Sequence, residues 1–205
     1  MSELFVSAFV TFLVIIDPPG CAPIFYGLTQ GAAPAERRAM AIRAVLIAAG
    51  ILLFFGLLGE DLLRALGISL SAFRIAGGIM LFLIAIDMVF EKRTERRENR
   101  AQEVSASEQE DVSVFPMAIP MIAGPGSIAS IMLLVARSEG LAETLLVFGA
   151  LAATLVLTLI ALLAAAPLMR LLGHRMEAMI TRILGVILAA LAAQFVIDGI
   201  ERSFS

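Results

Sequence analysis

The segment "LFVSAFVTFLVIIDPPGCAPIFYGL" (residues 4–28) begins as a membrane-spanning helix and then places an acid, three prolines and a glycine in residues 17–23. The apolar run at 4–16 would extend about 20 Å as a helix, whereas the hydrocarbon core of a bilayer is about 30 Å thick. Proline lacks an N–H and displaces a helical carbonyl, and unpaired backbone groups are costly in hydrocarbon. We therefore expect this interruption to be buried in protein or to line a wet cavity.

The composition is that of an integral membrane protein. The 205 residues are 60% hydrophobic and 16% charged, with a mean hydropathy of +0.97. The net charge of −3 argues against a nucleic-acid partner, because phosphate binding needs clustered, unbalanced Lys and Arg. One His and one Cys leave no metal-ligand or catalytic set at the usual spacing, so no metal site, no cofactor and no enzymatic activity are predicted.

The sequence contains six apolar segments that predict membrane spans, although the run at 4–16 is too short to cross alone, and they indicate an all-α membrane protein. Four of them are continuous, and two are interrupted by proline and glycine. The continuous segments are residues 40–59, 71–90, 144–166 and 179–200, and the interrupted ones are 4–16, continued by 17–28, and 114–136. The second interruption lies in "IPMIAGPGSI" (residues 119–128).

A polar stretch separates two sets of three spans. Residues 91–113 are rich in both charge signs and predict a hydrophilic cytoplasmic linker between one unit at 1–90 and a second at 114–205. With the N-terminus outside, the inner loops and flanks hold 11 Lys and Arg residues and the outer ones hold 4. Because positive charge favours the cytoplasmic side, both termini are predicted to be periplasmic.

The two units resemble each other in sequence. With an offset of 106 residues, "DPPGCAPI" (17–24) aligns with "AGPGSIAS" (123–130), and "LLRALG" (62–67) aligns with "LMRLLG" (168–173). With an offset of 108, "FRIAGGI" (73–79) aligns with "TRILGVI" (181–187). Since each unit has three spans, the second must be upside down relative to the first, as in many secondary transporters. This predicts two inverted three-helix repeats whose first and fourth helices are broken.

The two breaks predict a polar pocket near mid-membrane. Half-helices that begin after Pro23 and near Ser127 would present free N–H groups to a carboxylate, and the freed carbonyls would suit an ammonium group. A small zwitterion needs both. The alternative is that the prolines only bend two helices.

Asp17 is the most informative single residue. A carboxylate at the centre of a span costs about 2.5–3.5 kcal/mol on insertion scales and usually marks a path for a proton, ion or substrate. Asp17 is therefore the candidate for proton coupling, and its alternative role is to cap the second half-helix. Asp87 and Asp198 are expected to be interfacial, and Arg74 is expected to extend to the interface.

These motifs resemble the MarC family of six-helix inner-membrane proteins, over essentially the whole chain. The resemblance implies transport of glycine- or alanine-sized neutral amino acids across a bacterial inner membrane, with a proton or sodium ion as candidate coupling ion, and it leaves a homo-oligomer open. Many members carry Asn at the position of Asp17, which puts selectivity in question. Carried over to this chain, the substrate-binding residues are Asp17, Pro18, Pro19, Gly20, Cys21, Pro23, Ala123, Gly124, Pro125, Gly126 and Ser127.

The function expected from these observations is secondary transport of a small zwitterion by alternating access. Two alternatives remain open: an exporter of another small metabolite or drug, and a nontransporting membrane scaffold.

Overall fold

The regular structure of the described residues is entirely helical. The computed structural model describes residues 2–90, 92, 96, 99 and 111–204, without the side chains of 169–175 and 177. Most of the predicted linker at 91–113 lies outside this part. The elements are α1 (Ser2–Ile16), α2 (Pro18–Leu28), α3 (Pro34–Ala65), α4 (Leu70–Val89), η1 (Ser113–Ile122), α6 (Pro125–Val135), α7 (Leu141–Leu163) and α8 (Ala165–Phe204).

Five or six of these segments can span a membrane. Five are long and apolar enough alone. The first is Ser2–Leu28, which comprises α1 and α2; the others are α3, α4, α7 and the part of α8 at Ala178–Phe204. The sixth is the pair η1 and α6, which are bent by 52° relative to each other and pass the test only together. The protein is therefore all-helical and crosses the membrane several times, as the sequence predicts.

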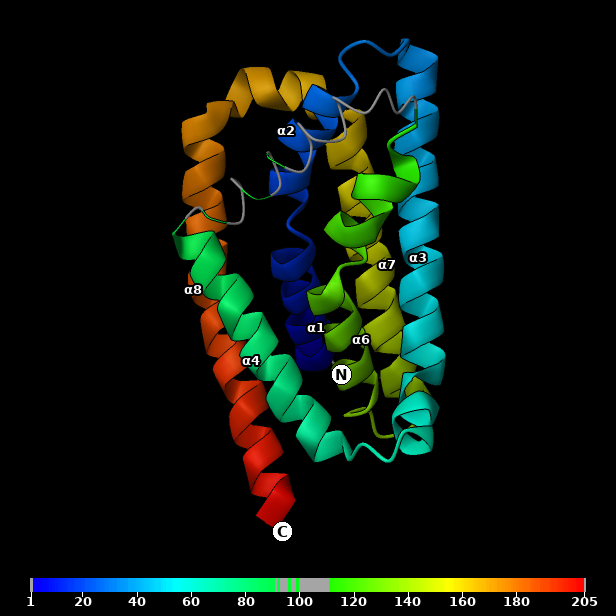
Figure 1. Cartoon of the computed structure of the whole chain (residues 1–205), viewed down its shortest axis with the longest axis vertical. Coiled ribbons are helices and arrows are strands. Elements are labelled where there is room, and N and C mark those ends of the chain that lie inside the picture. Colours follow the sequence, from blue (N-terminus) through cyan, green and yellow to red (C-terminus); the bar gives the residue numbers. More distant parts are fainter. Residues whose placement is uncertain (1, 91, 93–95, 97–98, 100–110, 205) are drawn as a thin grey trace.

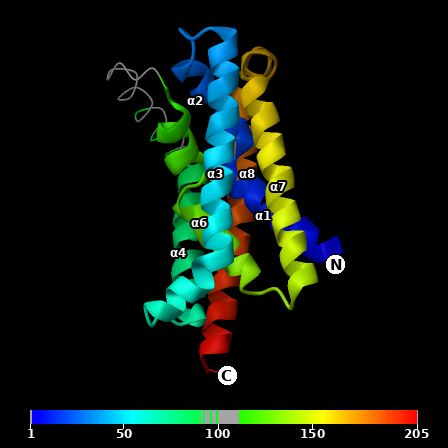
Figure 2. The same cartoon turned by 90° about the vertical axis from the view of Figure 1, so that its right-hand side faces the viewer.

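The chain runs back and forth along the long axis of the molecule (Figure 1). It rises through α1 and α2, descends through α3, rises through α4, descends through η1 and α6, rises through α7 and descends through α8. Both termini lie in the lower half of the view, and Figure 2 shows the same from the side. The connection at 29–33 and the junction of α7 with α8 at 164 lie at the upper end of the view.

The helices pack in a pattern that leaves apolar side chains on the outside. The first span packs on α7, α3 packs on η1 and α6, and α4 packs along α8. Large apolar side chains such as Leu46 and Phe54 on α3, Val156 on α7 and Val186 on α8 are more than half exposed. Soluble proteins rarely expose apolar surface of this extent, and these helices are long and apolar enough to span a membrane, so this outer layer is the lipid-facing surface.

The contact between α4 and α8 is close because each helix presents a glycine. A Cβ atom on Gly78 would lie 2.9 Å from the carbonyl oxygen of Ala192, and one on Gly185 would lie 3.1 Å from the carbonyl oxygen of Ala85. Small residues let helix backbones approach closely in membranes. These two glycines therefore hold the third and last spans together.

Two expectations from the sequence are corrected by the fold. The second half-helix begins at Pro18 instead of after Pro23, because proline is favoured at the first helical position, where no N–H is needed. Arg74 does not extend to the interface: it is 1% exposed, and its Nη2 atom donates to the carbonyl oxygen of Ala136, 3.4 Å away. The carbonyl-rich C-terminus of α6 attracts the guanidinium inward.

Candidate functional site

The first interruption is one residue long. The N–H of Asp17 still donates to the carbonyl of Leu13, at 3.0 Å, and the carbonyl of Asp17 accepts from the N–H of Cys21, also at 3.0 Å. Asp17 has a left-handed backbone (φ 59°), which Asp tolerates better than most residues. Its carboxylate accepts from the N–H of Gly20 at 3.2 Å. Asp17 is thus the N-cap of α2, the alternative role considered from the sequence, and it is 1% exposed.

The second interruption is longer and irregular. Phe115 and Ile119 have extended backbones within η1, and each precedes a proline, which disfavours the helical conformation of the residue before it. Gly124 then turns the chain into α6, with Pro125 at the first helical position. A Cβ atom on residue 124 would lie 2.4 Å from the carbonyl oxygen of Pro120, so only glycine fits this turn.

Each interruption is tied to the helix before it by a side chain. The thiol of Cys21 donates to the carbonyl oxygen of Ile16 at 3.3 Å, and the hydroxyl of Ser127 donates to the carbonyl oxygen of Ile122 at 2.7 Å. Each bond satisfies one of the carbonyls that a helix leaves unpaired at its end. Each interruption therefore has one backbone carbonyl satisfied by a side chain of the helix that follows.

A cavity of about 410 Å³ lies beside the second interruption. It is bounded by α4, by the end of α1 and by both sides of the bend between η1 and α6. The lining residues are Ile15, Met80, Leu83, Ile84, Asp87, Arg96, Pro116, Pro120, Met121, Gly124, Pro125, Gly126 and Ser127. The start of α6 thus faces a cavity within a membrane span.

The surrounding helices lie close to Gly126 at this helix start. A Cβ atom on residue 126 would lie 2.8 Å from Cδ1 of Ile84 and 3.3 Å from Cγ2 of Ile15. The N–H groups of Gly126 and Ser127 precede the first intrahelical bond of α6, which runs from Ile128 to Gly124. At a helix start such groups are available to an external acceptor.

Among the described residues that line the cavity, one carries a carboxylate, namely Asp87 near the end of α4. Its side chain is 18% exposed and forms an ion pair with Arg96, whose own side chain is 71% exposed. From its position in the sequence, Asp87 is expected at the membrane interface, and nothing there connects it with the interruptions. No local pattern identifies it, because its place in the cavity depends on how α4 packs beside α6.

The structure distributes the predicted site residues unevenly. Gly124, Pro125, Gly126 and Ser127 line the cavity, and Ala123 is buried next to them. The predicted residues of the first interruption do not line this cavity, where α1 contributes Ile15 instead. Asp17, Pro18, Gly20 and Cys21 are buried, and Pro19 and Pro23 are partly buried.

A second cluster of charges lies at the lower end of the molecule. Arg137, which follows α6, forms an ion pair with Asp198 of α8, and its guanidinium carbon lies 5.0 Å from the centre of the Phe195 ring. Burial lowers the pKa of Arg137, and the charges of Arg74 and Arg202 lower it further. Gln194 donates to Asp198 at 2.7 Å. This cluster ties the fourth span to the last one.

The described residues contain no group of three or more His, Cys, Asp or Glu side chains that could hold a metal ion.

Comparison with known proteins gives a consistent family assignment. A family model described as "MarC family integral membrane protein" matches residues 2–204. A UPF0056 membrane protein of Archaeoglobus fulgidus is 37% identical over 201 residues, which cover 97% of this chain and 92% of that protein. UPF0056 membrane protein YvbG of Bacillus subtilis is 34% identical and covers 100% of this chain and 97% of its own length. UPF0056 membrane protein YhcE of Escherichia coli is 34% identical, over 96% of this chain and 91% of that protein. No solved structure matches the chain.

Proposed function

Because the chain belongs to the MarC family of integral membrane proteins, and the start of α6 faces a cavity within a membrane span, we propose that it is a secondary transporter of small neutral amino acids. The proposed substrates are zwitterions of the size of glycine or alanine, and transport proceeds by alternating access. The single observation on which this rests is the helix start at Gly124–Ser127 that lines the cavity.

The chemistry of the cavity supports a small zwitterionic ligand. The positive end of α6 and the N–H groups of Gly126 and Ser127 suit a carboxylate. The volume of about 410 Å³ is near the lower end of the range for small-molecule pockets, which is about 300–1,000 Å³. Most of the remaining wall is apolar, so a ligand with an apolar side chain is favoured over one with a polar side chain.

The pattern of burial supports the proposed inverted repeat. With an offset of 106 residues, buried positions of α3 coincide with buried positions of α7. The pairs are Ala41 and Val147, Ala44 and Ala150, Val45 and Leu151, Ala48 and Thr154, and Leu52 and Thr158. The packing is reciprocal as well, since the first span packs on α7 as the fourth packs on α3.

The third and last spans agree with this proposal in a slightly different register. An offset of 107 residues relates the contact of Gly78 with Ala192 to the contact of Gly185 with Ala85. The same offset relates further buried pairs, namely Arg74 and Thr181, Leu81 and Leu188, and Met88 and Phe195. The packing thus favours 107 over the offset of 108 taken from the sequence alone.

A difference between the two interruptions supports the proposal of alternating access. Both sets are buried, but Gly124, Gly126 and Ser127 line the cavity, whereas their counterparts Pro18, Gly20 and Cys21 are not among its lining residues. The ion pair of Arg137 with Asp198 ties the fourth span to the last one at the lower end. In a second state, we expect this pair to separate and a cavity to form between α8 and the first interruption.

The remaining parts of the proposal concern coupling and location. Asp17, buried at the first interruption, is the proposed proton-coupling residue, with a sodium ion as the alternative coupling ion. The proposed location is a bacterial inner membrane with both termini in the periplasm, and the protein can act as a homo-oligomer. The residues at 17–23 and 123–127 form the proposed substrate path.

A ligand screen tests this proposal against the alternatives. Detergent-solubilised protein should show a higher melting temperature with glycine or alanine than with leucine or glutamate at the same ionic strength, at two pH values. A nontransporting scaffold should show no change in melting temperature with any of these amino acids. An exporter of another compound should show none with them either, but a higher melting temperature with one compound of a wider panel of metabolites and drugs. Absence of any shift with small amino acids at both pH values would reject the proposal.

A further inference from the structure

We propose that Asp87 binds the ammonium group of the substrate, and that Arg96 competes with the substrate for this carboxylate. This inference rests on the proposed function and identifies the residue that distinguishes an amino acid from a simple carboxylate. It assigns a binding role to a side chain of α4, which lies outside both interrupted segments.

Asp87 faces the same space as the start of α6. Ile84 lies one helical turn before Asp87, on the same side of α4, because residues three apart are neighbours on a helix surface. Cδ1 of Ile84 lies 2.8 Å from the position of a Cβ atom on Gly126, and both Ile84 and Asp87 line the cavity. A small zwitterion can therefore place its carboxylate at the N–H groups of α6 while its ammonium group approaches Asp87.

The surroundings of Asp87 favour a cation. Its side chain is only 18% exposed, and the neighbouring wall of α4 consists of Met80, Leu83 and Ile84. A carboxylate with little access to water attracts a nearby cation more strongly than one in bulk solvent. In this structure the cation is the guanidinium of Arg96.

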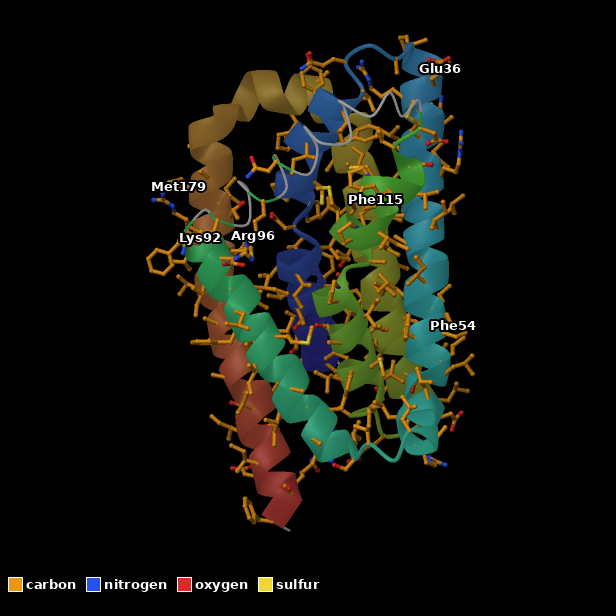
Figure 3. The ribbon with its side chains drawn as sticks, in the orientation of Figure 1. Glu36, Phe54, Lys92, Arg96, Phe115 and Met179 are labelled. Carbon is orange, nitrogen blue, oxygen red and sulfur yellow. The ribbon has the colours of Figure 1, made fainter. Side chains whose placement is uncertain are left out.

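Arg96 is a weakly held partner. It belongs to the segment after α4, at the upper end of that helix (Figure 3), and its side chain is 71% exposed. Ion pairs with a largely exposed partner contribute little stability, because water and the freedom of a long side chain compete with them. An ammonium group held at the same time by the start of α6 can therefore replace Arg96, which then acts as an internal competitor at the cavity.

Two variants and two matched controls test this inference in proteoliposomes. Asp87→Asn removes the negative charge that would bind the ammonium group. The concentration of unlabelled alanine that halves the uptake of labelled alanine should rise about tenfold or more, the typical loss for a charged hydrogen bond. Arg96→Gln should lower this concentration about two- to fivefold, as expected for the loss of an exposed ion pair. The controls are Asp61→Asn on the exposed side of α3 and Lys92→Gln, which neutralises another cation at the upper end of α4. Neither control should change competition.

A thermal-stability measurement separates this inference from the proposed function. Ethylammonium chloride, compared with sodium chloride at equal concentration, should raise the melting temperature of Arg96→Gln and not that of Asp87→Asn. Equal shifts in both variants, or none in Arg96→Gln, would overturn the inference even if alanine is transported. If the wild type transports no amino acid, the proposed function fails, and the ethylammonium result alone then decides whether Asp87 binds a cation.

Discussion

Cys21 and Ser127 make the same hydrogen bond at equivalent places in the chain. Each donates to the carbonyl oxygen five residues earlier, that of Ile16 for the thiol and that of Ile122 for the hydroxyl, and the two bonds are separated by 106 residues. Each bond joins a half-helix to the end of the helix before it. A donor at this position therefore stabilises both interruptions, although one is a sulfur and the other an oxygen.

This equivalence predicts that Cys21→Ser is tolerated. Serine supplies a shorter and stronger donor to Ile16, as Ser127 does to Ile122, whereas Cys21→Val keeps a similar volume and removes the donor. We expect the free energy of unfolding of the serine variant to lie within about 0.5 kcal/mol of the wild-type value. The valine variant should lose about 1–3 kcal/mol of this free energy, the cost of an unpaired buried carbonyl. The measurement is unfolding in detergent. Equal stability of both variants would show that the bond is unimportant.

Gly124→Ala should destabilise the bend before α6. The added methyl group would lie 2.4 Å from the carbonyl oxygen of Pro120, a backbone atom that cannot move independently. Overpacking of this kind costs about 1–3 kcal/mol. Gly27→Ala on α2 is the control, because nothing lies within 4 Å of the position of its Cβ atom. A melting temperature for Gly124→Ala at or above that of the control would contradict the prediction.

Replacements of Asp17 should separate its two roles. Asp17→Asn keeps an oxygen that can accept from the N–H of Gly20 and tolerates the left-handed backbone, so the fold should be retained. Asp17→Ala removes the cap and should cost about 0.5–2 kcal/mol. If Asp17 carries the proton, Asp17→Asn should lose amino acid flux driven by a proton gradient while its melting temperature stays near that of the wild type. Full gradient-driven flux in Asp17→Asn would exclude this role.

Gly78→Ala and Gly185→Ala should have similar effects. Both methyl groups would be forced against backbone carbonyls of the opposite helix, those of Ala192 and Ala85. We expect a loss of about 1–3 kcal/mol in each case and no loss for Gly50→Ala, which has open space around it. Chemical denaturation of the purified variants measures the difference. Strong destabilisation by only one of the two would argue against reciprocal packing of α4 and α8.

The sequence predicted most of the fold because membrane spans are set by length and apolar composition. It placed α3 at 40–59 instead of Pro34–Ala65, since the charged ends that continue this helix beyond hydrocarbon do not look apolar. The sequence also indicated that the second half-helix begins after Pro23, whereas it begins at Pro18. Asp17 accounts for this difference, because its left-handed backbone lets a new helix start at the very next residue.

The candidate site could be predicted only where it is local in sequence. Gly124–Ser127 follow from the Pro and Gly pattern, and they line the cavity. Asp87 and Ile84 enter it through the packing of α4 against α6, which no short motif encodes. Likewise, the burial of Arg74 depends on the carbonyl end of α6, which lies 62 residues away in the chain.

The most direct test of a zwitterion site at the start of α6 is alanine counterflow. Purified protein in liposomes loaded with unlabelled alanine should accumulate labelled alanine transiently. Gly126→Leu, whose Cβ atom would lie 2.8 Å from Cδ1 of Ile84 at the cavity wall, should abolish this accumulation, whereas Gly50→Leu, on an exposed position of α3, should preserve it. Accumulation no greater than in empty liposomes for folded wild-type protein, or undiminished accumulation in Gly126→Leu, would contradict the account.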